Sequence, residues 1–243
     1  NAAKESDSKF NGIASSVGAG LANVAKISAA AIAAGTVAVG AFMLSSIKSY
    51  AEYEQLVGGV DTLFKQSSDT IQQYAQNAYK TAGLSANEYM STVTSFSASL
   101  LQGLGGDTAK AADIGNMAVT DMADNANKMG TSMEMIQNAY QGFAKDNYTM
   151  LDNLKLGYGG TAGEMARLIN DSGVMGDSMK VTAETVNSIP FDKQIEAIHK
   201  IQTEMGITGT TAKEAAGTIS GSWSSLTASW DNVKTAIASG NDD

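Results

Sequence analysis

The sequence predicts an all-α fold, and three observations support this prediction. The chain of 243 residues contains one proline, Pro190. Long helices tolerate few prolines, because the ring removes a backbone donor and clashes with the preceding turn. Apolar residues recur every three or four positions over most of the chain, which is the period of a helix buried on one face. No segment alternates clearly as a strand would, and residues 179–186 are the stretch with the weakest helical pattern.

The N-terminal region is poor in charge. Residues 10–47 carry one charged side chain, Lys26, and the run 27–47 between Lys26 and Lys48 carries none. Its length suits a membrane span of about 20 residues. Most of it is alanine, glycine, serine and threonine, so we favour an Ala-rich helix packed within protein and keep membrane insertion as the alternative. The side chains that would face a membrane are Ile27, Ile32, Val37, Val39, Phe42, Met43, Leu44 and Ile47.

The next segments carry helical periodicity and helix-start signals. Residues 50–64 contain a seam with heptad-like spacing, formed by Tyr50, Tyr53, Val57, Val60 and Phe64. Ser85 and Glu88 have the spacing of a capping box. The helix that they start should bury Tyr89, Val93, Phe96 and Leu100 and end at Gly103, Gly105 and Gly106.

Further helix starts and ends follow along the chain. Asp107 should cap a helix that ends at Gly130 and buries Ala111, Ile114, Ala118, Met122 and Met129. Three more pairs have capping-box spacing, namely Thr131–Glu134, Thr161–Glu164 and Thr211–Glu214. Pro190 should open a helix that runs through Ile195, Ile198, Ile201 and Met205 and stops at Gly206.

The last predicted helix has the most regular apolar stripe. Its members alternate steps of three and four, and they are Trp223, Leu226, Trp230, Val233 and Ile237. Such a stripe must be buried against another surface. The heptad-like spacing favours sister copies of the chain over the chain's own middle helices. We therefore predict that these residues form an oligomer or docking interface.

The residue inventory argues against catalytic and metal sites. The chain has no cysteine and one histidine, His199. Zinc sites usually need several histidines or cysteines, so we interpret His199 as structural and expect no metal and no cofactor. In the glycine-rich stretches 101–110 and 156–161, no lysine stands at the position that a phosphate loop requires, and no strand precedes either stretch, so we interpret both as turns.

Two other groups of residues are interpreted as structural. Asp121, Asp124 and Asn125 lack the order of a calcium loop, so we expect them on a solvated helix face. Five methionines recur near helical spacing and should fill the core. They are Met117, Met122, Met129, Met133 and Met135.

The net charge of −9 and the pI of about 4.6 argue against nucleic-acid binding.

Five segments of the chain resemble, in the same order, signature blocks of tail tape-measure proteins from long-tailed bacterial viruses. The segments are AEYEQLVGGVDTLF (51–64), EYMSTVTSFSASLLQGLGGDTAKAA (88–112), MAVTDMADNANKMGTSMEMIQ (117–137), NAYQGFAKDNYTMLDNLKLGYGGT (138–161) and EAIHKIQTEMGITGTTAKEAAGTISGSW (196–223). The resemblance is strongest in the segment 138–161. The whole resemblance covers roughly residues 51–237, which is most of the chain.

This resemblance implies a structural protein and no enzyme. A tape-measure protein lies in the lumen of the tail tube, sets tail length during assembly and leaves at infection to aid genome delivery. The implied partners are the tail tube protein, tail tip or hub proteins, assembly chaperones and further copies of the chain. The implied locations are the virion tail, the host cytoplasm during assembly and the host inner membrane at infection. The alternatives are a membrane-active channel that uses residues 27–47 and, less favoured, a cell-wall hydrolase.

We expect three regions in the chain. Residues 1–48 form an apolar helical segment, residues 49–220 a helical core domain, and residues 221–243 an amphipathic C-terminal helix. The chain begins with Asn1, and tape-measure proteins are usually much longer. We therefore expect the chain to be part of a longer protein.

Overall fold

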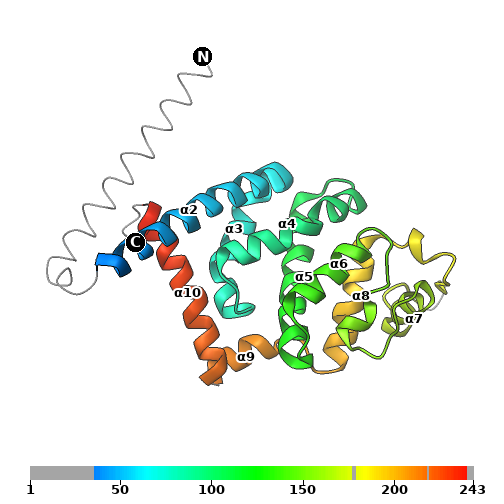
Figure 1. Ribbon diagram of the computed structural model, residues 1–243. Helices are drawn as coiled ribbons and strands as arrows, with labels where there is room; N and C mark the ends of the chain where they lie inside the picture. Colours follow the sequence, from blue (N-terminus) through cyan, green and yellow to red (C-terminus); the bar gives the residue numbers. More distant parts are fainter. Residues whose placement is uncertain (1–35, 177–178, 218, 240–243) are drawn as a thin grey trace, which may run out of the picture. The chain divides into compact units, whose positions relative to one another are not determined.

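The computed structural model describes residues 36–176, 179–217 and 219–239, and the regular elements among them are helices (Figure 1). The predicted all-α class is confirmed. Residues Leu56–Ala228 form one compact unit. The described parts of Asn1–Gln55 and Ser229–Asp243 belong to a second unit, which contains the first part of α2 (Thr36–Phe64) and the last part of α10 (Ile219–Ser239).

Helix α5 (Thr108–Met129) is the centre of the compact unit. It packs against five other helices, whose bounds are α3 (Ser68–Thr81), α4 (Ala86–Gly103), α6 (Met133–Phe143), α8 (Phe191–Glu204) and α9 (Thr210–Gly217). In Figure 1 it is the green helix beside α4 and α6. The side chains of Ala111, Ile114, Ala118 and Met122 are buried as predicted, whereas Met129 is half-buried.

The starts and ends of α4 and α5 follow the local signals in the sequence. Ser85 accepts a hydrogen bond from the Glu88 amide, and the Glu88 carboxylate accepts one from the Ser85 amide, so the predicted capping box is confirmed. The Asp107 side chain accepts a hydrogen bond from the Lys110 amide, and Gly130 closes α5 with a left-handed backbone. The apolar face of α4, from Tyr89 to Leu100, is fully buried.

Two of the other three predicted capping boxes are wrong, and one is half correct. Helix α6 is capped by Ser132, while the Thr131 hydroxyl donates to the carbonyl of Asn153 instead. At α7 (Ala162–Ser172), Thr161 accepts from the Glu164 amide, but the Glu164 carboxylate accepts from Gly159. Thr211 lies inside α9 and does not cap it.

Helix α8 begins after Pro190 and ends at Glu204, close to the predicted bounds. Ile195, Ile198 and Ile201 are buried, and Gly206 follows with a φ of +67°. Met205 forms the C-cap, one residue beyond the end of the helix, and is exposed. Residues 179–186, which have the weakest helical pattern in the sequence, lead into one short 3-10 turn, η3 (Val186–Ser188).

The candidate membrane residues lie partly outside the described chain. Ile27 and Ile32 precede its first described residue, and Val37, Val39, Phe42, Met43 and Leu44 lie in α2 at positions whose side chains are not described. Ile47 is exposed, and further along α2 Val60 and Phe64 of the predicted seam are buried. Among the described residues, no helix combines the length and the apolar character that crossing a bilayer requires.

Candidate functional site: the polar contacts of helix α5

Three polar residues of α5 are buried, and the prediction that they form a solvated helix face is wrong. Asp121, Asp124 and Asn125 are each no more than 1% exposed. They lie on the side of α5 that faces α8, α9 and the segment before α7, and each binds a group far away in the sequence. Buried polar groups are costly unless they have partners, so these contacts select one arrangement of the neighbouring helices.

Asp121 pairs with His199 of α8. The Nδ1 atom of His199 lies 2.9 Å from both carboxylate oxygens of Asp121. The Asp121 side chain is buried, whereas the His199 side chain is 35% exposed. The hydrogen bond to Asp121 raises the pKa of His199, and burial raises the pKa of Asp121 despite the opposing effect of His199. The only histidine of the chain thus joins α5 to α8.

Asp124 caps a helix that is distant in the sequence. Its carboxylate accepts hydrogen bonds from the amides of Gly209 (2.6 Å) and Thr211 (2.8 Å), at the start of α9. A helix N-terminus has free amides and a partial positive charge, so a carboxylate is a favourable partner there. This contact explains the error at Thr211, because the cap of α9 comes from another helix and not from its own sequence.

Asn125 holds the segment 138–161, whose residues carry the family resemblance. Its Nδ2 atom donates to the carbonyl of Leu154 at 2.9 Å, at the end of the 3-10 turn η2 (Leu151–Leu154). The Thr131 hydroxyl donates to the neighbouring carbonyl of Asn153. The start of α6, η2 and the end of α5 are therefore tied together by side chains.

The segment 138–161 is itself tightly packed. A Cβ atom on Gly142 would stand 2.8 Å from the Asn147 carbonyl oxygen, and one on Gly160 would overlap the carbonyl group of Thr149. The aromatic rings of Tyr140, Phe143 and Tyr148 pack in series, with centroids 5.7 and 6.2 Å apart. The segment's glycines and aromatic residues thus serve backbone approach and core packing.

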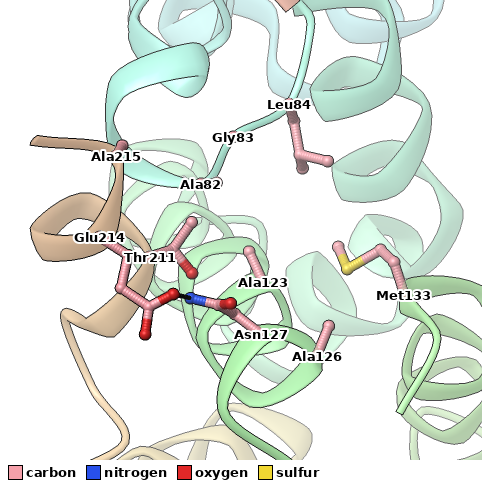
Figure 2. A pocket seen from close by; sticks show the side chains of 10 residues that line it. All are labelled: Ala82, Gly83, Leu84, Ala123, Ala126, Asn127, Met133, Thr211, Glu214 and Ala215. Atoms are coloured by element: carbon pink, nitrogen blue, oxygen red, sulfur yellow. Dashed lines mark hydrogen bonds between the residues drawn. The ribbon is translucent and has the colours of Figure 1, made fainter. Parts of the chain in front are cut away.

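A cavity of about 200 Å³ opens beside α9 (Figure 2). Leu84, Ala123, Ala126 and Met133 form its apolar side. Across the opening, Asn127 donates a hydrogen bond to Glu214 of α9 at 3.0 Å. No signal in the sequence marked this cavity, because its walls come from α5, α9, the turn before α4 and the start of α6.

The remaining predicted residues have mixed positions. In the C-terminal stripe, Trp230 is 55% exposed and Val233 is 42% exposed, and the side chains of Trp223, Leu226 and Ile237 lie outside the described ones. Met122 is buried and Met117, Met129 and Met133 are half-buried, but Met135 is 47% exposed, so its predicted core position is wrong. Within the described residues, no group of three or more histidine and acidic side chains is placed to hold a metal ion.

Both glycine-rich stretches contain turns. The first follows α4, where Gly105 and Gly106 have positive φ, and the second precedes α7, where Gly157 does. Comparisons with protein-family models, with curated proteins and with solved structures gave no match for this chain.

Proposed function

We propose that the chain is part of a tail tape-measure protein, which sets the length of a viral tail and takes part in genome delivery. The observation that carries the proposal is the order of five resembling segments over residues 51–237. The packing of residues 138–161 supports a structural role, because their glycines and aromatic rings make close contacts within the compact unit.

The physical basis of a ruler is the constant rise of a helix. Each helical residue adds about 1.5 Å, so chain length is converted directly into distance. A single helix of this chain's length would span on the order of 360 Å by that rise. Residues Leu56–Ala228 instead form one compact unit. We therefore assign this part of the ruler to a folded head or tip module rather than to the extended rod.

In-frame deletions in the parent gene test the proposal. Removal of helical stretches outside the folded module should shorten tails by about 1.5 Å per residue removed, as measured on electron micrographs. The matched control is Gly159→Ala, which preserves chain length and should leave tail length unchanged. Tails of unchanged length after large deletions would rule out the ruler function.

A membrane-active role is the second candidate, because residues 27–47 lack charge over about the length of a bilayer span. Under this alternative, the segment inserts in the host inner membrane and helps to form a channel. Liposome flotation of the chain with and without residues 10–47 tests it. Binding that depends on these residues supports the alternative, and equal recovery of both forms in the unbound fraction contradicts it.

A further inference from the structure

We propose that α9 is a lid that is held shut by Asp124 and that opens as a unit over the cavity beside it. This inference concerns a conformational device of the compact unit and does not depend on the proposed function. Three features carry it: the weak apolar anchoring of α9, the buried carboxylate at its N-terminus, and the glycines that precede it.

Helix α9 has little apolar contact with the rest of the unit. Its sequence is TTAKEAAG, which contains no large apolar side chain, and none of residues 210–216 is buried. The last well-buried apolar side chain before it is Ile207. Helices in proteins owe most of their stability to the packing of an apolar face. An element without such a face belongs to the least stable parts of a fold.

The polar contact at Asp124 replaces this missing anchor. Both of its carboxylate oxygens are used, one by the amide of Gly209 and the other by that of Thr211. The hydrogen bond between Asn127 and Glu214, one turn further along each helix, adds a second and exposed contact. One turn before Asp124, Asp121 is paired with His199 of α8.

The chain enters α9 through two glycines with left-handed backbone. Gly206 has a φ of +67° and Gly209 a φ of +81°, values that residues with a side chain rarely adopt. Glycine also has the widest choice of other conformations, so these positions can act as hinges. Gly209 follows Ile207, so when the contact at Asp124 breaks, α9 can swing about Gly209 while Ile207 stays buried.

Opening of the lid exposes apolar side chains. Ala123 lies on the α5 wall of the cavity and is only 6% exposed, and Leu84 and Met133 face the cavity from the other side (Figure 2). In the closed position the methyl group of Thr211 faces Gly83, where an added Cβ atom would be at ordinary contact distance, 3.6 Å. The device therefore controls access of solvent to this wall.

Thiol labelling tests the lid, because the chain has no cysteine of its own. Ala123→Cys places a single thiol under the lid, and Ala118→Cys places one in a buried part of the same helix that does not line the cavity. We expect the thiol at position 123 to react at least tenfold faster under native conditions. Equal rates at the two positions would show that Ala123 becomes accessible only on global unfolding and would overturn the proposal.

The role of Asp124 is tested by Asp124→Asn in both cysteine backgrounds. A charge-assisted hydrogen bond is stronger than a neutral one, so we expect roughly tenfold faster labelling at position 123 and little change at position 118. The control is Asp113→Asn, which alters an exposed residue of α5 that binds Tyr74. Unchanged labelling at position 123, or an equal rise at both positions, would overturn the role of Asp124. If Asp124→Asn does not fold, Glu214→Ala provides the second variant, with a smaller rise expected at position 123 alone and no rise as the contrary result.

Discussion

Two buried tyrosines differ in whether their hydroxyl groups have partners. The Tyr89 hydroxyl donates to Asn116 at 2.9 Å, whereas the Tyr140 hydroxyl is buried without a hydrogen-bond partner. Tyr140→Phe should therefore leave the free energy of unfolding unchanged or raise it by up to about 1 kcal/mol, and Tyr89→Phe should lower it by about 1 kcal/mol. Urea denaturation of both variants measures the difference. A larger loss of stability for Tyr140→Phe than for Tyr89→Phe would show that the Tyr140 hydroxyl has a hydrogen-bond partner in the folded chain.

The pair of His199 and Asp121 should make stability depend on pH. Both pKa values are raised in the folded state, so the folded chain holds these protons to a higher pH than the unfolded chain. The contribution from His199 is fully present below its ordinary pKa of about 6.5 and is lost as pH rises through its raised value. Ionisation of buried Asp121 acts in the same direction at lower pH.

We therefore expect the free energy of unfolding to fall as pH rises across neutrality. His199→Gln should remove this dependence, because the chain contains no other histidine. Urea midpoints at a series of pH values for the wild type and the variant provide the measurement. If the two curves remain parallel through this range, the pair does not govern the pH dependence.

The burial of Asp121, Asp124 and Asn125 could not be predicted from the sequence. Helical periodicity identifies apolar faces and assigns the polar positions to solvent. The partners of these residues lie far along the chain, with separations of 78 residues for Asp121 and His199 and 85 for Asp124 and Gly209. Asp121 lies between two buried apolar residues, Val119 and Met122, and this position was the available hint in the sequence.

The fold of the segment 138–161 depends on close backbone contacts. Gly160→Ala should lower the free energy of unfolding by about 1–3 kcal/mol, because the added methyl group overlaps the Thr149 carbonyl and the backbone must shift. Gly159→Ala is the matched control, since its Cβ atom would meet only the Glu164 side chain at 3.6 Å. Thermal and urea denaturation compare the two. Equal losses of stability for the two variants would show that the close approach of Gly160 to the Thr149 carbonyl does not affect folding.

Helix bounds were predictable where the signal is local. Ser85, Asp107 and Gly130 act on their own helices, and the structure confirms all three. The start of α6 was misplaced by one residue because Thr131 and Ser132 are both good caps. The start of α9 was missed because its cap is Asp124 of α5, and no local pattern contains such a contact.

Composition and periodicity were sufficient to predict the all-α class. They were not sufficient for the way in which the helices assemble. The central position of α5 follows from contacts with elements between residues 68 and 217, and periodicity identifies a buried face without identifying its partners. The expected divisions at residues 48 and 220 stay predictions.

The apolar stripe of α10 is exposed where its side chains are described. Trp230 and Val233 lie one turn apart on α10 and are 55% and 42% exposed in the single chain. Apolar side chains at heptad spacing are typical of helices that associate. We therefore expect the chain to self-associate through α10, with Trp223, Leu226 and Ile237 on the same seam.

Trp230→Ala should weaken this association. Truncation of a fully buried tryptophan to alanine lowers stability by about 3–5 kcal/mol. The Trp230 ring is half exposed in the single chain, so its truncation has this cost only where a second copy covers the ring. The variant should therefore lose stability at high protein concentration and little on dilution, whereas Thr235→Ala, at a half-buried position away from the stripe, should have no effect that depends on concentration. Sedimentation velocity and melting temperatures over a concentration series measure both. If wild type and Trp230→Ala are monomers that melt at the same temperature, the stripe is neither a core nor an interface.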